Sequence, residues 1–593
     1  MTAEVPLIAV AIFLVLVATI LALPRRRVPW RARAALAVGA VGAFVPLLAF
    51  PFRDPARSSG TALWEWSAAG GPTVHASYRF DGLAAVVMFA TIGYTIAGLL
   101  GVQRASRRHQ LLPALVLATG FVSIALAVTD DLIAASVALG VLAALTAFAE
   151  LIVAPATASA RLAAFFAIGV QSFVVAALLV ARYGEGAFTF DTIRPTSVSP
   201  GVILAGALGA ALFAGLYPFI PWRYEGETAR TPEREPLRGL LAMPAGVGAT
   251  AVFIRLLGST RGEISTFALP AAHPAASIGA VVLVLALVIP LALRRRPVPL
   301  RPLAVGALLL VLIALYPSLN FSHIVLVAAL LSVAYAAAVT LAMPEQWEVV
   351  RYDVALAAVW VGLAVGTPTA LAGALFLLIA DATAAMLGAI WLPPHRWYIA
   401  SVTAATASIG AMLAIGAGIR GAPDLPTQAL AVAALAALLL LVLVNLGREL
   451  TEAFVPTELD VTGGAVAFLG SLLLALVSAP ALEHALASTL ARPIGPAGPS
   501  APFAVPALVV TATLLVVVAR TVRPLLPDLG AVAGGLRTIV AAVDPVPAVI
   551  ALFRILEGGT GRASAVFGAF EERAGVWLAT LLIVGLLVWA TRI

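Results

Sequence analysis

Titratable side chains inside otherwise apolar segments are the residues of this sequence that could do chemistry. Asp381 stands in the stretch LFLLIADATAAMLGAI, ten or more residues from either end of its apolar run. A carboxyl group in such a place is costly to ionise, which makes it a functional candidate. It could bind and release a proton, and the chemistry predicted is therefore proton transfer. It could equally make a structural hydrogen bond to a neighbouring helix, and the sequence leaves both interpretations open.

Two further carboxylates lie at opposite ends of one apolar segment. Glu150 is near the end of the segment, in TAFAELIV, where it could titrate inside the apolar region or lie at the headgroup level near Arg161. Asp131, preceded by Asp130, opens the same segment. A carboxylate at a helix start commonly caps the free backbone N–H groups. Glu150 and Asp131 are proton-path candidates, each with a structural alternative.

Two uncharged polar side chains interrupt other apolar segments. His323 could relay a proton, because imidazole titrates near neutral pH. His323 and Gln171 could also be hydrogen-bonding groups that hold packed helices together. We expect this packing role for both residues and keep His323 among the proton-path candidates.

The sequence contains neither lysine nor cysteine, so all 36 residues of the Lys+Arg count are arginine. Buried lysine can titrate, whereas arginine stays protonated in proteins. The absence of cysteine excludes disulfides, thiolate metal sites and Cys-ligated iron–sulfur clusters. We also find no phosphate-binding loop, no clustered metal ligands and no Ser/His/Asp arrangement. No catalytic residue, cofactor or metal site is therefore expected within this chain.

The composition predicts an all-α integral membrane protein. The 593 residues are 62% hydrophobic and 11% charged, and the mean hydropathy is +1.05. Such a chain could not cover the surface of a soluble domain. The apolar runs are continuous and rich in Ala and Leu, which favours membrane-spanning helices over a barrel. We expect about eighteen spans, near 5–23, 33–51, 82–101, 111–128, 132–153, 162–181, 201–221, 239–257, 275–293, 302–316, 322–343, 353–366, 369–391, 398–418, 427–446, 462–480, 503–519 and 574–591.

The arginines predict the orientation of these spans. They cluster in the short loops 24–32, 102–109, 223–238 and 294–301. The number of expected spans between these loops places all four on the same side of the membrane. Because arginine-rich loops lie in the cytoplasm, the N-terminus is predicted to be outside. The same distribution explains the net charge of +7 without nucleic-acid binding. The mixed-charge loop 223–238 could be a solvated face or a docking surface for a peripheral cytoplasmic subunit.

Five short motifs occur in a fixed order between about residues 75 and 420. They are 78–101 (YRFDGLAAVVMFATIGYTIAGLLG), Asp131-Leu132, 160–190 (ARLAAFFAIGVQSFVVAALLVARYGEGAFTF), Tyr217-Pro218-Phe219 with Trp222, and 366–375 (GTPTALAGAL). Together they resemble the antiporter-like membrane subunits of respiratory complex I, multi-subunit sodium/proton antiporters and group 4 membrane-bound hydrogenases.

This resemblance implies an antiporter-like fold with inverted repeats and broken helices. We divide the chain into N-terminal spans with an outer loop (1–75), the antiporter-like core (76–420), additional spans (421–519), and an amphipathic, lateral segment with a terminal span (520–593). The implied setting is a prokaryotic cytoplasmic membrane, with the lipid bilayer, other membrane subunits, a peripheral cytoplasmic subunit, and protons or sodium as partners. Any enzyme activity, such as NADH–quinone oxidoreduction, would belong to partner subunits, since this chain shows no redox centre.

The departures from the family pattern concern its proton path. Where the family has a glutamate, a lysine, and then His, His and Lys on a later helix, this chain has Gly140, Phe213, and then Leu377, Asp381 and Ala385. We therefore predict a subunit with a degraded proton path that scaffolds a complex or couples weakly to ions. Two alternatives stay open: an active proton-translocating subunit that uses Asp381 and Glu150, and a stand-alone secondary transporter.

Overall fold

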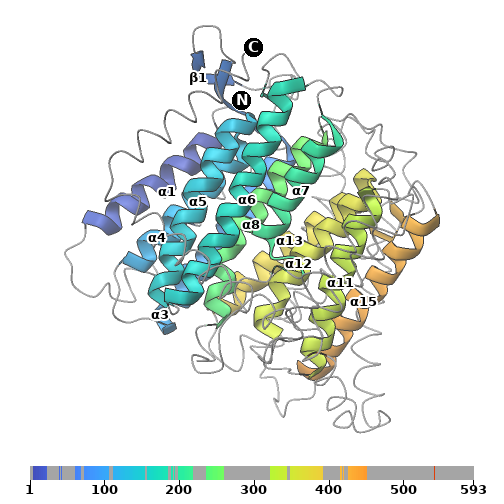
Figure 1. Ribbon diagram of the computed structural model, residues 1–593. Helices are drawn as coiled ribbons and strands as arrows, with labels where there is room; N and C mark the ends of the chain where they lie inside the picture. Colours follow the sequence, from blue (N-terminus) through green and yellow to red (C-terminus); the bar gives the residue numbers. More distant parts are fainter. Residues whose placement is uncertain are drawn as a thin grey trace, which may run out of the picture.

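The computed structural model describes the helices that carry most of the singled-out residues (Figure 1). The described residues are 5–22, 39–40, 42, 61–67, 73–105, 111–153, 156–183, 188–190, 193, 198–217, 219, 235–258, 321–342, 347–390, 415–416, 418–419, 425–449 and 540. Several expected spans lie wholly or largely outside them: 33–51, 275–293, 302–316, 398–418, 462–480, 503–519 and 574–591. Apart from residue 540, the expected amphipathic segment before the last span also lies outside them.

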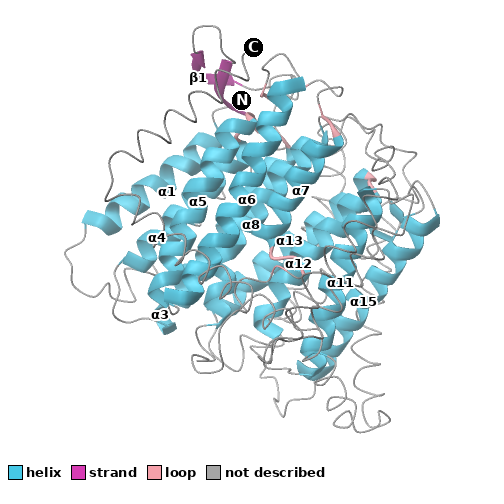
Figure 2. Ribbon diagram, in the orientation of Figure 1, coloured by secondary structure: helices cyan, strands magenta, loops and turns pink. Residues whose placement is uncertain are grey.

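Helices make up nearly all of the described structure (Figure 2). They are α1 (Val5–Ala22), α3 (Gly82–Ala105), α4 (Leu111–Val128), α5 (Leu132–Val153), α6 (Ala156–Tyr183), α7 (Pro200–Ala214), α8 (Glu235–Gly258), α11 (Phe321–Ala342), α12 (Trp347–Val365), α13 (Pro368–Ile390) and α15 (Leu425–Glu449). A helix satisfies its own backbone hydrogen bonds, as an apolar segment in lipid must.

Six of the described helices are long and apolar enough to cross a membrane. These spans are Gly82–Leu100, Leu111–Val128, Leu132–Val153, Ser159–Arg182, Arg238–Gly258 and Pro368–Met386. Shorter apolar helices cover Gly201–Ala214, Val325–Val339, Tyr352–Val365 and Leu425–Leu438. The described part of the chain thus agrees with a multi-span helical protein and contains fewer spans than the expected total of about eighteen.

One small sheet accompanies the helices. Strands β1 (Thr61–Ser67) and β2 (Thr73–Tyr78) pair in antiparallel fashion in a region expected to be an outer loop. The hairpin leads directly into α3, and an isolated bridge links Tyr78 to Thr129 just before α5. It therefore ties the starts of α3 and α5 to the same end of the bundle.

The helices form two connected groups. In the first, α3 packs against α4 and α8, while α5, α6, α7 and α8 follow one another as packed neighbours. The second group contains α11, α12 and α15, drawn in yellow and orange in Figure 1. α13 joins the groups by packing on both α3 and α12. Small residues allow this contact, because a Cβ atom added to Gly93 would lie 3.2 Å from the Cβ of Ala382.

The helix is interrupted between α12 and α13, where the sequence predicted the end of one span and the start of the next. Gly366 adopts a left-handed conformation with φ 73°, which favours glycine, and Pro368 starts α13. The Thr367 side chain accepts a hydrogen bond from the backbone N–H of Ala370 at 3.3 Å. This turn fixes the start of the helix that carries Asp381.

Candidate functional site

Glu150 and Arg238 form a buried ion pair between α5 and α8. The Arg238 Nε atom donates to Glu150 Oε1, and the two side chains are 3% and 2% exposed, respectively. The sequence predicted that Arg238 lies in a cytoplasmic loop, and that Glu150 lies either inside the apolar region or at the headgroup level near Arg161. The structure corrects the position of Arg238, which belongs to α8 and faces the bundle interior. A hydrogen bond between a guanidinium and a carboxylate is stronger than one between neutral groups.

A second ionic group, the Asp81 cluster, consists of Arg79, Asp81, Asp130 and Arg255. Arg255 Nη2 donates to Asp81 Oδ1 at 3.1 Å. Arg79 Nε lies 3.6 Å from Asp81 Oδ2, and Arg79 Nη1 lies 3.7 Å from Asp130 Oδ1. Arg255 also donates to the backbone carbonyl of Thr129. The cluster holds together the starts of α3 and α5 and the end of α8.

The charge state of Asp81 follows from these contacts. Burial by itself raises the pKa of Asp81, but the guanidinium groups of Arg255 and Arg79 outweigh it. The backbone N–H of Ala84, which donates to Asp81 Oδ1 at 2.8 Å, acts in the same direction. The pKa of Asp81 therefore lies below its ordinary value of 3.8, and the carboxyl is ionised at neutral pH.

Asp131 caps α5, as the structural alternative for this residue predicted. Its Oδ1 atom accepts hydrogen bonds from the backbone N–H groups of Ile133 at 2.8 Å and Ala134 at 2.9 Å. These are N–H groups of the first helical turn, which lack partners within the helix. Asp131 is fully buried, and its backbone pairs with Thr189.

The two ionic groups mark opposite ends of the same helix pair. Asp131 and Glu150 are nineteen positions apart on α5, which corresponds to about 28 Å along a helix. Arg238 and Arg255 are seventeen positions apart on α8, or about 26 Å. Both lengths are close to the thickness of the hydrocarbon core of a bilayer. The structure therefore separates two of the predicted proton-path residues, Glu150 and Asp131, by most of that thickness.

Asp381 lies between these ends and bonds to a tyrosine. The Tyr94 hydroxyl on α3 donates to Asp381 Oδ2 at 2.8 Å. Asp381 is 8% exposed and Tyr94 is fully buried. The Tyr94 ring meets Tyr352 edge-on, with ring centroids 6.1 Å apart. Asp381 is thus held in the contact between α3 and α13.

A short chain of hydroxyl groups crosses the centre of the first helix group. The Ser123 hydroxyl donates to the carbonyl of Pro244 at 3.0 Å. The Thr91 and Ser123 hydroxyls are 3.1 Å apart, and because the Ser123 hydrogen is used, Thr91 is the donor. Pro244 lies inside α8, where a proline removes a backbone donor from the helix. The Ser123 hydroxyl thus adds a hydrogen bond from α4 to α8 at this proline.

Aromatic side chains fill the position where the family resemblance places a lysine. Phe213 is fully buried on α7 and stacks on Phe166 of α6, with ring centroids 4.5 Å apart. Cβ atoms added to Gly169 or Gly209 would lie within 2.9 Å of the Phe213 or Phe173 rings. The crossing of α6 and α7 at this point is closely packed and apolar.

The remaining singled-out residues have different surroundings. Ala385 on α13, at a position where the family resemblance places a lysine, is buried at 6% exposure. His323 is buried near the start of α11, at 8% exposure. Gln171, for which a helix-packing role was predicted, lies on the exposed side of α6.

Sequence reasoning missed three buried charged residues: Arg238, Arg255 and Asp353. Arg238 and Arg255 lie in one apolar helix with Pro244 between them. An arginine inside an apolar run must find a partner, so this pattern was the available signal. Among the described residues, no three His, Cys, Asp or Glu side chains are placed to hold a metal ion.

Solved structures with this arrangement of helices include two membrane complexes. A chain in the structure of the Mrp complex from Dietzia sp. DQ12-45-1b matches with a TM-score of 0.63 and 17% identity, over 99% of the present chain and 63% of that chain. A chain of respiratory complex I from Thermus thermophilus with bound NADH matches with a TM-score of 0.54 and 20% identity, over 82% of the present chain and 99% of that chain. The present chain shares its fold with both.

The matches confirm the resemblance to antiporter-like membrane subunits at the level of fold. The present chain spans less than two thirds of the length of the Mrp chain. No protein-family model matches the sequence, and no curated protein matches it. Together with the apolar helices, the shared fold makes this a multi-pass membrane protein related in structure to parts of multi-subunit membrane complexes.

Proposed function

We propose that this chain is a scaffolding membrane subunit of a multi-subunit complex related to complex I or to Mrp antiporters, with a degraded proton path. The observation that carries the proposal is the stack of Phe213 on Phe166. The resemblance places a titratable lysine at residue 213. An aromatic stack at a glycine-lined helix crossing has no group there that binds a proton and little space for water.

The ionic contacts support the same proposal. Proton transfer requires groups that gain and lose a proton in turn. Arg238 keeps its charge, so its pair with Glu150 is a permanent tie between α5 and α8. Asp131 is engaged in capping α5. Both carboxylates therefore serve the packing of the helix bundle.

A second candidate function is active proton translocation through Asp381. The hydrogen bond from Tyr94 favours it, because both groups can exchange protons and both lie inside the bundle. In this alternative, the further groups that bind and release protons would be Glu150, Asp131 and His323. We rank it below the scaffold because about 28 Å of helix separates Asp131 from Glu150. A stand-alone secondary transporter with only a fold-level likeness is the third alternative.

The proposed setting completes this function. The complex would lie in a prokaryotic cytoplasmic membrane with the N-terminus of this chain outside. Its partners would be other membrane subunits and a peripheral cytoplasmic subunit docked near 223–238, with protons or sodium moved by the complex. The core would comprise 76–420, with 1–75, 421–519 and 520–593 around it.

Affinity purification and an ion-coupling assay test the proposal together. The full chain is tagged in its native cells and extracted in mild detergent, and its co-purifying proteins are identified. We expect several membrane proteins and at least one soluble protein. Asp381→Asn should leave both the assembly and acidification of inverted membrane vesicles unchanged. Loss of acidification in an intact complex would establish the active path instead, and purification of the chain alone would favour the stand-alone transporter.

A further inference from the structure

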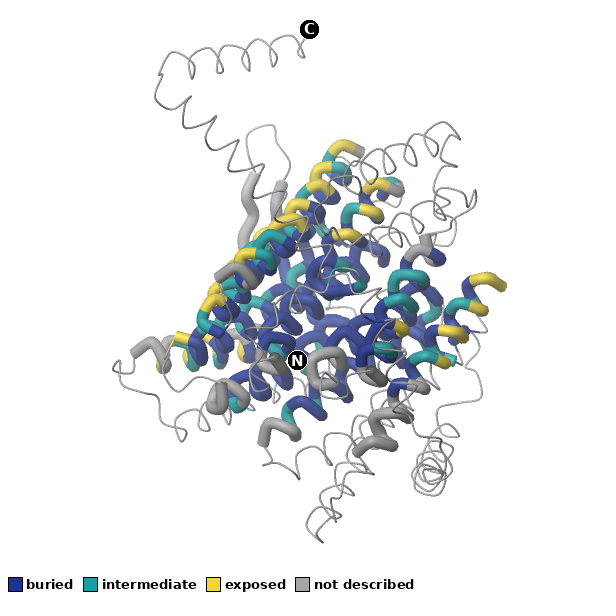
Figure 3. Tube along the Cα trace, turned by 60° about the horizontal axis from the view of Figure 1, so that its bottom comes forward, coloured by how far each residue is buried: buried dark blue, intermediate teal, exposed yellow. Residues whose placement is uncertain are grey.

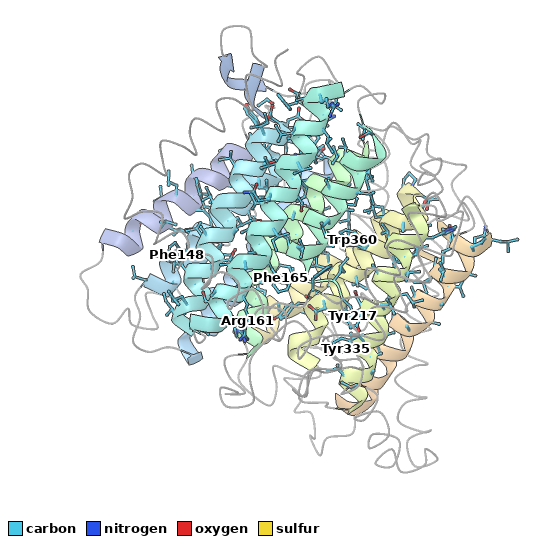
Figure 4. The ribbon with its side chains drawn as sticks, viewed as in Figure 1. Phe148, Arg161, Phe165, Tyr217, Tyr335 and Trp360 are labelled. Atoms are coloured by element: carbon cyan, nitrogen blue, oxygen red, sulfur yellow. The ribbon has the colours of Figure 1, made fainter. Side chains whose placement is uncertain are left out.

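Helices α5, α6 and α7 present a continuous exposed surface, here called the α5–α6–α7 face. Exposed positions recur along it every three or four residues, and the large apolar side chains among them include Val137, Val141 and Phe148 on α5, Ile168, Val175 and Leu178 on α6, and Leu204 and Leu208 on α7. Figure 3 shows exposed positions, in yellow, running along one edge of the bundle. In Figure 4, Phe148 lies on the opposite side of the view from Tyr217 and Trp360. Such a face would contact either lipid or another membrane helix.

Gln171 lies in the middle of this face. It is exposed on α6, in the same stripe as Ile168, Val175 and Leu178. Arg161 and Arg182 lie ten and eleven positions away in the two directions, or about 15 Å each along the helix. Half the hydrocarbon thickness of a bilayer is also about 15 Å, so Gln171 lies near the centre of the membrane.

A primary amide is poorly suited to contact with lipid at this depth. Its carbonyl and NH₂ groups can form several hydrogen bonds, and acyl chains offer no partner. The structure shows no hydrogen bond from Gln171 to another described residue. Glutamine side chains in membrane helices commonly bond across to a neighbouring helix. The position of Gln171 therefore favours a protein partner over lipid on this face.

The charges at the end of α6 favour a different protein over a second copy. A two-fold axis along the membrane normal would place two copies of α6 side by side and parallel. Arg182, which is exposed at the end of the face, would then approach its own symmetry copy. Like charges placed opposite one another disfavour such an interface. A helix of another subunit avoids this repulsion.

We propose that the α5–α6–α7 face binds a transmembrane helix of another subunit, which places a hydrogen-bonding side chain opposite Gln171. This inference rests on the proposed function, since it assigns the surface by which the subunit joins its complex. The predicted partner is an apolar helix with one polar side chain near the membrane centre.

Site-specific photocrosslinking tests the surface directly. The chain has no cysteine, so Val175→Cys gives one attachment point for a benzophenone maleimide. Val432→Cys on α15 is the matched control, because Val432 is exposed to a similar extent, 55% against 47% for Val175. We expect the Val175 probe, within the purified complex, to crosslink to a membrane-spanning peptide of a co-purifying subunit. The Val432 probe should give at least about threefold less of this product.

Gln171→Leu tests the hydrogen bond itself. The substitution removes an amide from an exposed apolar face, so the isolated chain should keep or increase its melting temperature. Retention of the partner during detergent washing should fall by about threefold or more, as expected for one lost interhelical hydrogen bond. Val175→Leu, one turn away, should retain the partner. A fall in both stability and retention would indicate a structural role for Gln171 within the chain and would overturn the inference.

The remaining outcomes separate this inference from the proposed function. A crosslink to lipid alone, in a complex that still co-purifies, would show that the α5–α6–α7 face does not bind another subunit. The proposed function as a subunit of a complex would be unaffected. A product of twice the mass of the chain identifies a second copy, and a crosslink within the chain identifies one of its own segments; either result overturns the choice of partner. Purification of the chain without any other protein overturns the proposed function itself.

Discussion

Glu150 and Arg238 are 88 positions apart in the sequence and form an ion pair inside the helix bundle. The pair joins α5 to α8 at one end, while Arg255 joins α8 to Asp81 at the other end. Pro244 lies between these two arginines and removes one backbone hydrogen bond from α8. The helix therefore has an ion pair on each side of its proline. Both ion pairs use arginine, which stays protonated in proteins.

The Glu150–Arg238 pair should show strong coupling between its members. Glu150→Leu alone would leave the Arg238 charge buried without its partner, and it should destabilise the protein by about 3–5 kcal/mol. The double variant Glu150→Leu/Arg238→Met replaces both charges with apolar groups and should be close to wild type. Thermal unfolding in detergent, followed by the fluorescence of the ten tryptophans, measures both. Additive effects of the two substitutions would show that the pair contributes little to the fold.

The crossing of α6 and α7 should tolerate no side chain at Gly209. A Cβ atom there would lie 2.8 Å from the Phe173 ring and 2.9 Å from the backbone oxygen of Gly169. Because backbone cannot move aside, Gly209→Ala should cost about 1–3 kcal/mol. Gly140→Ala is the control: its Cβ would meet only Val170, at 3.8 Å. This variant should gain up to about 1 kcal/mol from helix propensity, measured by the same unfolding experiment.

Acid should weaken the end of the bundle that contains the Asp81 cluster. The pKa of Asp81 is lowered in the folded protein by Arg255 and Arg79 against the opposing effect of burial. Its contribution to stability is therefore complete above the ordinary pKa of 3.8 and is lost as the pH falls through the lowered value. Asp81→Asn should be less stable than wild type at pH 7, and the difference should shrink below about pH 4. A difference that stays constant from pH 7 to pH 3 would contradict this account.

The predicted orientation places the loops 24–32, 102–109, 223–238 and 294–301 in the cytoplasm. A single cysteine in each loop of this cysteine-free chain should resist an impermeant maleimide in intact cells and react after permeabilisation. For the third loop the cysteine should lie before Glu235, because α8 begins there and Arg238 is buried. Labelling of any of these loops in intact cells would contradict the assignment.

Local signals allowed parts of the fold to be predicted from the sequence. The spans 111–128 and 132–153 match α4 and α5 at both ends, because Asp131 caps the second helix and separates it from the first. The break at Gly366 was also predicted, since glycine and proline interrupt a helix by backbone geometry alone.

Contacts between distant segments could not be predicted in this way. Hydropathy identifies a membrane helix but does not say which side faces its neighbours, because lipid and protein interiors are both apolar. The sequence therefore did not indicate that Gln171 lies on the exposed side of α6. Glu150 bonds to Arg238, and Asp381 bonds to Tyr94. In each pair the two residues come from helices far apart in the sequence, and no local pattern connects them.

The hydrogen bond between Tyr94 and Asp381 should stabilise the contact between α3 and α13. Asp381→Asn keeps a carbonyl oxygen that can accept the Tyr94 hydroxyl, so stability should change by less than about 1 kcal/mol. Asp381→Leu leaves that buried hydroxyl without an acceptor and should cost about 1–3 kcal/mol. Adding Tyr94→Phe to Asp381→Leu removes the stranded hydroxyl and should recover part of this loss. Unfolding midpoints of wild type, Asp381→Leu, Tyr94→Phe and the double variant give the coupling energy, and a double variant no better than Asp381→Leu would show that the two side chains act independently.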